Sequence, residues 1–467
     1  MNESLRGKNF IDPDKLYSLV KGSVPAKAEV DTILNKAREL KGLSLEEVAV
    51  LLRAEDHDQI RAIMDTAHYA KEEIYGKRLV FFAPIYTGNT CMNNCTYCAF
   101  RRDNRELKRS VLTMPQIDQE VRTLLKEGHK RILLICGEDH FRSSTDYMCE
   151  AIRTAYAARE GKDYVRRINV ELAPMPVESF RRLKVEKIGT YVCFQETYDP
   201  ELYKVYHPEG TPKADYLNRL TVMDRAMEAG VDDVGLGVLF GLADYRFEIL
   251  AIMEHAKHLE EAFGCGPHTV SFPRIEPADN APLTQNIPYR VSDEDFKKII
   301  AIIRIALPYT GIILSTRESD EMRTELFSYG VSQISAGSRT NPGAYSDEAS
   351  QTGSQFSLGD HRSLDEVIAS VVEHGYIPSF CTGCYRKGRV GHDFMDLAKP
   401  GLIKEYCMPN AVFTFREYLD DFASPETKKN GLKLISELVS QVEKPELKKN
   451  MEETLGKIEK GTRDLYF

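Results

Sequence analysis

Residues 78–98 read RLVFFAPIYTGNTCMNNCTYC and join an apolar run to a group of cysteines. The run at 78–86 predicts a buried β-strand. Three cysteines follow it in the spacing C-x3-C-x2-C. Beyond them, short apolar runs alternate with amphipathic segments to about residue 375. The stretch therefore opens a series of alternating strands and helices, with cysteines after the first strand.

Eight apolar runs with helical segments between them predict a (β/α)8 TIM barrel. An open doubly wound sheet is the competing topology, and the number of strands favours the barrel. Helices are indicated by segments such as 113–128 and 213–230, each of which stops at a glycine, the usual residue beyond a helix end. The predicted strands are 78–86, 131–136, 167–173, 190–197, 231–240, 268–278, 311–318 and 331–338.

Helical segments are expected on both sides of the barrel in the sequence. Before the barrel, Ser44 and Glu47 form a capping-box signature at the start of an apolar run with helical spacing. After a last barrel helix at 363–375, the chain continues as an extension rich in Lys and Glu, with amphipathic helical patterns at its end. The predicted units are an N-terminal helical segment (1–77), the barrel (78–375) and a mainly helical C-terminal extension (376–467).

The composition restricts the expected partners and location. The 467 residues carry a net charge of −9, which is poorly suited to nucleic acid or to an anionic membrane surface. No apolar run approaches the roughly 20 residues that span a bilayer, and the first residues lack the apolar core of a signal peptide. We expect a cytoplasmic protein, in which clustered cysteines indicate metal or redox chemistry rather than disulfides.

Cys91, Cys95 and Cys98 form the first cysteine group. Three thiolates fit a [4Fe–4S] cluster in which one iron lacks a protein ligand. A zinc site, which normally has a fourth ligand, and three cysteines that merely share a loop are the alternatives. Loops after the strands lie on the upper face of a barrel, so an open iron there would bind a small molecule that chelates through an amine and a carboxylate.

Cys381, Cys384 and Cys407 form the second cysteine group, with the spacing C-x2-C-x22-C. Three cysteines again suggest an iron–sulfur cluster with one open iron. A zinc site with His392 as the fourth ligand is the alternative. Because the helix at 363–375 should return the chain to the lower face of the barrel, this group is expected at the end opposite the first one.

His268 begins the sixth predicted strand and is therefore expected at the same lower end. It is either an ordinary core histidine or a metal ligand. The two cysteine groups would be too far apart to share a substrate. A product of the upper site would have to diffuse to the lower one, which indicates a small molecule.

The first cysteine group resembles that of the radical S-adenosylmethionine (SAM) superfamily. Its C-x3-C-x2-C motif follows the first barrel strand, and an aromatic residue precedes the last cysteine. The resemblance implies that the cluster binds SAM, which one electron cleaves to a 5′-deoxyadenosyl radical. ICGEDH (135–140) stands where the family has Gly-Gly-Glu, with Cys136 in place of the first glycine. The cofactor-binding residues implied are Tyr97, Gly137, Glu138, Glu171, Glu196 and Gly237, although a strand-end glutamate is equally often a salt-bridge partner.

The two cysteine groups together resemble the tyrosine lyases that mature [FeFe]-hydrogenase, the HydG family. The resemblance covers essentially the whole chain. FQETYDPELYKVYHPEG (194–210) is shared with the thiazole-pathway tyrosine lyase ThiH, and the C-terminal extension is specific to the maturases. A 2-iminoacetate synthase of the ThiH type is the alternative.

The resemblance implies cleavage of L-tyrosine at Cα–Cβ to p-cresol and dehydroglycine, which yields carbon monoxide and cyanide. An additional labile iron at the second [4Fe–4S] cluster, bound with free cysteine, would collect them as an Fe(CO)(CN) unit for H-cluster assembly. His268 matches the family histidine that helps to hold this iron. The partners implied are SAM, L-tyrosine, free cysteine, hydrogenase maturation proteins and a reductant such as ferredoxin or flavodoxin.

Tyrosine recognition requires a cation for the carboxylate, and the ends of the seventh and eighth strands supply candidates. Arg323 is the first choice, although a surface salt bridge is the alternative for it, and Arg317 and Ser319 stand nearby. The loop 339–362 is long for a barrel and is expected to close the site. Other polar residues at these strand ends are Thr316, Glu318, Ser338 and Arg339.

Two rival classes of protein remain open. A non-catalytic iron–sulfur scaffold would carry iron units and would form no deoxyadenosine from SAM. A zinc-stabilised structural protein would contain zinc rather than iron and sulfide.

Overall fold

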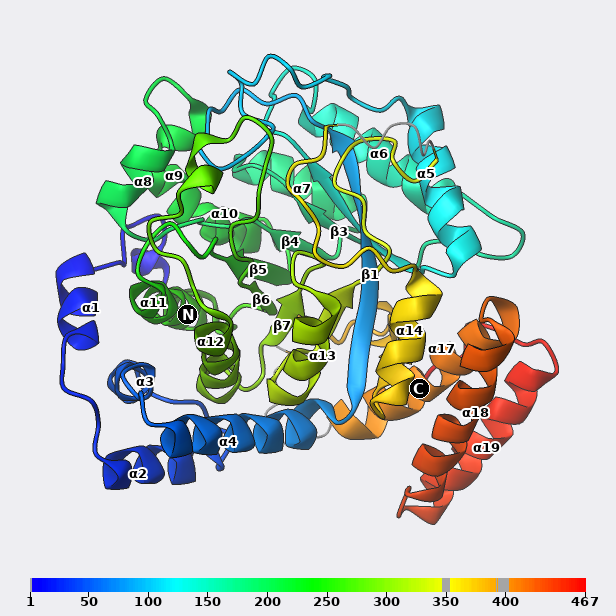
Figure 1. Cartoon of the computed structure of the whole chain (residues 1–467). Helices are drawn as coiled ribbons and strands as arrows, with labels where there is room; N and C mark the ends of the chain where they lie inside the picture. The colour runs from blue at the N-terminus through cyan, green and yellow to red at the C-terminus, as the bar shows by residue number, and fades with distance from the viewer. Residues whose placement is uncertain (1, 347–352, 392, 394–402) are drawn as a thin grey trace.

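The computed structural model describes residues 2–346, 353–391, 393 and 403–467, and its centre is a closed barrel of parallel strands (Figure 1). The first strand pairs with both the second and the eighth, which closes the barrel. The fold predicted from the alternation of strands and helices is confirmed. The barrel strands are β1 (Arg78–Gly88), β2 (Arg131–Cys136), β3 (Arg167–Glu171), β4 (Thr190–Val192), β5 (Asp233–Gly237), β6 (Thr269–Ser271), β7 (Gly311–Leu314) and β8 (Gln333–Ser335).

Helices surround the barrel and begin and end at the residues that favour such ends. In the first of them, Thr113 and Gln116 form a capping box and Gly128 ends the helix with a φ of 101°. The segment 213–230 forms two helices that meet at Thr221, whose hydroxyl bonds the Leu217 carbonyl. The helices are α5 (Met114–Glu127), α6 (Thr145–Ala157), α7 (Val177–Val185), α8 (Pro200–Tyr206), α9 (Tyr216–Leu220), α10 (Val222–Glu228), α11 (Tyr245–Phe263), α12 (Asp293–Ala306), α13 (Asp320–Tyr329) and α14 (Leu364–Glu373).

Several strands are shorter than the apolar runs that predicted them. The run at 190–197 contains only the three residues of β4, and the run at 268–278 only the three of β6. Gln195 and Thr197, which follow β4, are nevertheless buried. The chain beyond each strand folds into the interior at the upper end of the barrel. Residues beyond a strand end can thus be as buried as the strand itself, which makes the predicted strands too long.

A ninth strand, β9 (Ile377–Ser379), extends the sheet beyond the last barrel helix. It pairs in parallel with the lower end of β1, from Arg78 to Val80, whereas β8 pairs with β1 from Val80 to Phe82. The eleven residues of β1 therefore leave their lower part open for a further strand. β9 brings the second cysteine group to the lower end of the barrel.

The N-terminal segment forms four helices around and below the barrel (Figure 1). α4 packs against α12 and α13, and α3 packs against α11 and α12. The predicted capping box of Ser44 and Glu47 is present at the start of α3. These helices are α1 (Pro13–Val20), α2 (Lys27–Ala37), α3 (Leu45–Leu52) and α4 (His57–Tyr75).

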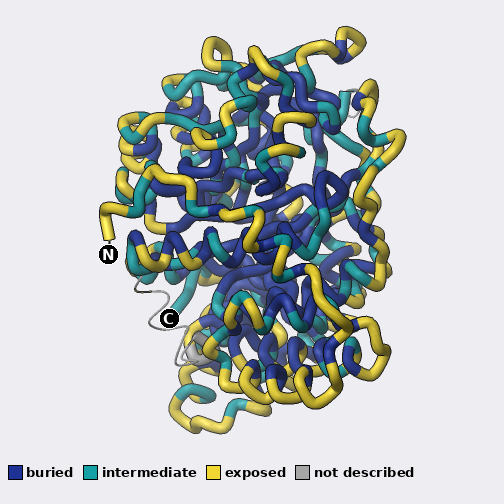
Figure 2. The backbone as a smooth tube through the Cα atoms, turned by 90° about the vertical axis from the view of Figure 1, so that its left-hand side faces the viewer, coloured by how far each residue is buried: buried dark blue, intermediate teal, exposed yellow. Residues whose placement is uncertain are grey.

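The C-terminal extension forms α15 (Gly383–Arg386), α17 (Ile403–Asp421), α18 (Pro425–Ser440) and α19 (Pro445–Glu459). α17 packs on β9 and α4, while α18 packs on α14. Apolar side chains of α17 and α18 belong to the same hydrophobic core as the barrel. Figure 2 shows buried segments running from the barrel into these helices, with exposed turns around the outside. None of the helices described is long and apolar enough to cross a membrane.

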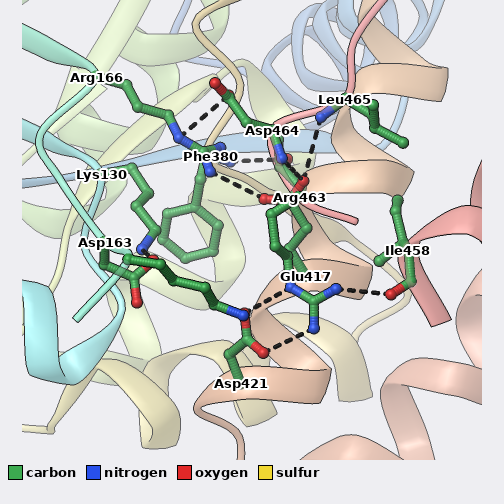
Figure 3. Close-up of polar contacts among 12 residues, drawn as sticks. Lys130, Asp163, Arg166, Phe380, Glu417, Asp421, Ile458, Arg463, Asp464 and Leu465 are labelled. Atoms are coloured by element: carbon green, nitrogen blue, oxygen red, sulfur yellow. Dashed lines mark hydrogen bonds and ion pairs between the residues drawn. The ribbon is translucent and has the colours of Figure 1, made fainter. Parts of the chain in front are cut away.

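Ion pairs fix the extension to the strand ends at the bottom of the barrel (Figure 3). The guanidinium of Arg166, just before β3, lies 3.1 Å from the carboxylate of Glu417 in α17 and 3.3 Å from that of Asp464. Within the extension itself, Arg463 donates two hydrogen bonds of 2.7 Å to the carboxylate of Asp421. Because the side chains of Arg166 and Glu417 are only 6% exposed, this contact is a buried ion pair that positions the extension.

Candidate active site and second cysteine site

The first cysteine group lies on the loop that leaves the upper end of β1. Cys95 is buried, and Cys91 and Cys98 are half-buried. Burial raises the pKa of Cys91 to about 12 and that of Cys95 to about 11. A cation among these thiols would stabilise their deprotonated forms. The buried group of three therefore fits an iron–sulfur cluster.

Arg109 folds this cysteine loop, although no motif in the sequence marks it. Its Nη1 donates hydrogen bonds of 2.7 Å to the carbonyl oxygens of Asn89 and Phe100. Its Nη2 donates to those of Arg101 and Asn104, at 2.5 and 3.2 Å. One side chain thus fixes the backbone on both sides of the cysteines, and only the folded loop shows its role.

Gly137 and Glu138 lie against the cysteine loop, directly after β2. A Cβ at Gly137 would stand 2.3 Å from the carbonyl oxygen of Thr90, so no larger residue fits without a shift of the backbone. The amide of Asn93 donates to the carboxylate of Glu138 at 2.5 Å. The structure thus brings both predicted residues to the first cysteine group, and their contact with SAM stays a prediction.

Tyr97 also lies beside this group and is buried. Its hydroxyl lies 2.8 Å from Nε2 of His207, whose Nδ1 lies 2.8 Å from the Tyr203 carbonyl oxygen and therefore carries the proton. The Tyr97 hydroxyl then donates to Nε2. His207 was not singled out from the sequence, because a lone histidine after a helix carries no signal of its own.

Glu196 lies beyond β4 rather than at its end, in a left-handed backbone conformation with a φ of 71°. That conformation is strained for a residue with a side chain. The carboxylate lies 2.6 Å from Nζ of Lys213 and 3.8 Å from Arg219. Burial opposes ionisation, but Lys213 and then Arg219 hold the pKa of Glu196 below its usual value. A Cβ at Gly237 would meet the ring of Phe194 at 2.5 Å, so the glycine admits that ring beside β5.

The upper barrel interior forms a pocket next to the first cysteine group. Gln355 connects the two, because it lines the pocket and its amide donates to the sulfur of Cys98 at 3.6 Å. Glu171 and Arg317 place opposite charges in the pocket wall. Burial and then Glu196 raise the pKa of Glu171 to about 7, while Arg317 opposes that shift. The pocket thus offers a cation and a titratable carboxyl, which suits an amino-acid ligand.

The structure separates the residues predicted to bind tyrosine. Arg317 lines the pocket. Arg323 is fully buried, pairs with Asp360 and donates to the carbonyl oxygen of Ser335. Ser319 caps α13. The geometry favours Arg317 as the cation for the carboxylate, and the roles of Arg323 and Ser319 stay predictions.

Other polar residues predicted at these strand ends are divided between structural contacts and the pocket. Glu318 forms an ion pair with Arg274. The carbonyl oxygen of Thr316 accepts bonds from Gly359 and Asp360 at 2.9 and 3.1 Å. Part of the predicted closing loop, residues 347–352, lies outside the described residues. The pocket is also lined by Thr316, Ser338, Thr340 and Phe356.

The second cysteine group lies at the lower end of the barrel. Cys381, Cys384 and Cys407 line one small cavity together with His268. This confirms that the group and His268 meet at the end opposite the first cysteines. Gln333, the first residue of β8, lines both this cavity and the upper pocket. The two sites therefore adjoin the same barrel interior.

Cys265 joins this group, although in the sequence it stands alone. It is 6% exposed and packs in one cluster with Cys407 and Cys384. Its thiol donates to the carbonyl oxygen of Gly266 at 3.4 Å. Only the fold brings it there, since Cys407 lies 142 positions after Cys265 in the sequence.

Arginines dominate the charge around the lower cavity. The side chains of Arg78 and Arg131 line it, and the Nε atoms of both are buried without a hydrogen-bond partner among the described residues. A hydrogen bond from Cys384 lowers the pKa of Cys407, burial opposes that, and Arg78 lowers it further. Cations of this kind, one buried and one half-buried, fit an anionic group among the cysteines, such as three thiolates with an iron–sulfur core.

His268 contacts groups other than the cysteines in this structure. Its Nε2 lies 2.9 Å from the hydroxyl of Tyr385, and its Nδ1 lies 3.6 Å from the carboxylate of Asp233. Arg167 lies 3.3 Å above the ring centre of Tyr385. Within the described part of the chain, no three His, Cys, Asp or Glu side chains form a single-ion site. His392, the alternative zinc ligand, lies outside that part.

Comparisons with known proteins agree with this arrangement. The model of the radical SAM superfamily matches residues 85–256, and that of the biotin and thiamin synthesis associated domain matches residues 271–377. The 2-iminoacetate synthase of Salmonella typhimurium is 30% identical over 352 residues, which cover 75% of this chain and 89% of the relative. The chain belongs to the radical SAM superfamily.

Within the superfamily, the chain is similar over its full length to HydG, a maturase of the [FeFe]-hydrogenase. One HydG crystal structure is 47% identical, has a TM-score of 0.95, and is matched over 98% of this chain and 100% of its own. HydG from Carboxydothermus hydrogenoformans is 42% identical with a TM-score of 0.84, over 95% and 97% of the two chains. The resemblance recognised from the two cysteine groups is confirmed.

Proposed function

We propose that this chain is a tyrosine lyase of the cytoplasm that uses SAM and a [4Fe–4S] cluster to cleave L-tyrosine between Cα and Cβ. The products are p-cresol and dehydroglycine, and the latter yields carbon monoxide and cyanide. The lower site delivers these as an Fe(CO)(CN) unit for [FeFe]-hydrogenase assembly. Full-length similarity to HydG structures supports this assignment.

The observation that carries the proposal is the second cysteine group at the lower end of the barrel. Its cavity and the upper pocket share Gln333 as a wall residue. An enzyme that only cleaved tyrosine would need the upper site alone. Three cysteines and His268 at the opposite end of one interior are explained if a small product is collected there.

The residues of the upper site bind and orient the reactants. A bound cluster with SAM supplies the radical that removes hydrogen from tyrosine. Arg317 holds the substrate carboxylate, because a guanidinium donates two parallel hydrogen bonds to such a group. Glu171, with a pKa of about 7, holds or accepts a proton beside it. Gly137, Glu138 and the Glu196–Lys213 pair shape the SAM side of the pocket.

The lower site holds a second [4Fe–4S] cluster through Cys381, Cys384 and Cys407. The additional iron is cargo and would be bound by free cysteine and by His268. To bind it, the His268 ring would give up its hydrogen bond to the Tyr385 hydroxyl. Hydrogenase maturation proteins receive the iron unit, and a ferredoxin or flavodoxin supplies electrons to the upper cluster.

A 2-iminoacetate synthase of the ThiH type is the second candidate, because such an enzyme of Salmonella typhimurium is 30% identical to this chain. Both candidates release p-cresol. Only the maturase also releases carbon monoxide and delivers iron, so these two products discriminate between them.

The test is anaerobic reconstitution with iron and sulfide, followed by SAM, reductant and tyrosine. We expect p-cresol together with carbon monoxide. Replacing both Cys381 and Cys384 with alanine should leave p-cresol formation within about threefold and abolish the iron–carbonyl product, because these ligands touch only the lower cluster. Cys149→Ala, a buried cysteine of α6, is the control. Unchanged products in the double variant would refute a role for the lower site.

A further inference from the structure

Two arginines line the lower cavity from the starts of neighbouring strands. Arg78 is the first residue of β1 and Arg131 the first of β2. Both line the same cavity as the three cysteines and His268. Arg131 is 4% exposed. The lower end of a barrel usually contributes stability rather than function, so cations in a cavity there require an explanation.

These two cations have few partners. Arg131 donates to the carbonyl oxygen of Cys381 at 3.0 Å. Within the described residues, no carboxylate pairs with Arg78 and its Nε has no hydrogen-bond partner, while its guanidinium lies 5.9 Å from the ring centre of Tyr75. Arg167, the neighbouring arginine on β3, differs because Asp233 pairs with it at 3.3 Å.

The cysteines alone do not balance these charges. In its oxidised form, a [4Fe–4S] core with three thiolates carries one net negative charge, whereas Arg78 and Arg131 bring two positive charges. A buried charge is costly unless it is paired. The cavity is therefore suited to one further small anion.

The cavity wall also includes Gly311, the first residue of β7, and Gln333. A Cβ at Gly311 would lie 2.8 Å from the side-chain nitrogen of Gln333, so the glycine makes space for that amide at the cavity. The amide is neutral and leaves the charge of the two arginines unchanged.

We propose that the lower cavity is an anion-holding site in which Arg78 and Arg131 bind cyanide as its anion, with the proton of hydrogen cyanide released to solvent. The inference rests on the proposed function, which makes cyanide above this cavity. Carbon monoxide is uncharged and receives no such retention from the arginines. The site would therefore keep cyanide beside the cysteines until iron takes it, while carbon monoxide is held by the metal alone.

The test is equilibrium dialysis of labelled cyanide against protein reconstituted with both clusters, with SAM present to occupy the open iron of the upper cluster and without reductant or tyrosine. Arg78→Met should weaken cyanide binding by at least about tenfold, because the half-buried positive charge in contact with the anion is lost. Arg78→Lys, which keeps the charge, should stay within about threefold of the unaltered protein. Arg181→Met, an exposed arginine of α7, is the matched control. Equal binding by the Arg78→Met and unaltered proteins would overturn the proposal.

Two further measurements distinguish cyanide binding by the arginines from binding by iron and from misfolding of a variant. In the Cys381→Ala, Cys384→Ala protein, cyanide binding should persist and still depend on Arg78. Loss of all binding there would mean that iron alone holds cyanide, which also overturns the proposal. Arg131→Gln gives an independent loss if Arg78→Met fails to fold. Because the cyanide is supplied from outside, failure of tyrosine cleavage would refute the proposed function and leave this result standing.

Discussion

The two ends of the barrel each hold three cysteines but balance charge in different ways. At the upper end, Glu196 is paired with Lys213 and Arg219, and Glu171 lies across the pocket from Arg317. At the lower end, Arg78 and Arg131 face the cysteines without a carboxylate among the described residues. The upper site is thus balanced by its own side chains. The charge of the lower site is balanced only by the groups that it binds.

The two ends also differ in how the backbone positions the sulfur atoms. The upper cysteines lie within eight residues of one another, on a loop that Arg109 and Gly137 hold. The lower cysteines reach their cavity through β9 and α17, which ion pairs fix to the barrel. A local motif makes the upper site, and long-range packing makes the lower one.

The largest effect expected from this comparison comes from Gly137→Ala. The new Cβ would meet the Thr90 carbonyl oxygen at 2.3 Å and the Cβ of Cys91 at 3.3 Å, so the cysteine loop must move. We expect p-cresol formation to fall by up to about a hundredfold, the upper range for loss of a group that orients metal ligands. Roughly half of the iron should remain, because the lower site is untouched.

Iron and sulfide analysis together with SAM cleavage measures this effect. Gly456→Ala in α19, where a Cβ meets nothing within 4 Å, is the control and should behave as the unaltered protein. Full activity of Gly137→Ala would show that the glycine does not support the cysteine loop.

Substitutions of Arg317 and Arg323 should have effects of intermediate size, on substrate binding for the first and on stability for the second. Arg317→Met should raise the KM for tyrosine by about tenfold to a hundredfold with little change in stability, because the pocket loses its cation for the carboxylate. Arg323→Met should instead lower the free energy of unfolding by about 1.5–3 kcal/mol, since Asp360 loses its bond to Arg323 but stays paired with Arg362.

Steady-state assays of p-cresol and urea unfolding of both variants make the distinction. A raised KM for Arg323→Met at unchanged stability would reverse the assignment and return Arg323 to the substrate site.

The smallest effect is a pH dependence at the upper site. The pKa of Glu171 in the folded chain is about 7, above its ordinary value of 4.5. The folded state therefore holds a proton that the unfolded state has released, so this contribution to stability is complete below about pH 4.5 and is lost as the pH rises through 7. Glu171→Gln removes the dependence.

We expect Glu171→Gln to match the unaltered protein near pH 4.5 and to exceed its free energy of unfolding by up to about 3 kcal/mol at pH 8. Urea unfolding without SAM at the two pH values measures the difference. An equal difference at both values would show that Glu171 does not titrate between them.

Much of the fold could be predicted because its signals are local. The capping box at Ser44 and the glycine that ends α5 are set by neighbouring backbone groups, and the structure contains both. Strand ends were less predictable, since 190–197 was predicted as one strand although β4 stops at Val192. Burial of the upper loops produces the same composition as a strand does.

The sequence by itself determined the barrel, the two cysteine groups and their opposite ends, because strand count, cysteine spacing and chain direction are properties of the chain order. Only the tertiary structure decided which distant side chains meet there. It placed Arg109 on the cysteine loop, Cys265 beside Cys407, and Arg78 and Arg131 in the lower cavity. Such contacts depend on burial and on the register of the closed barrel, and a single sequence carries no local signal for either.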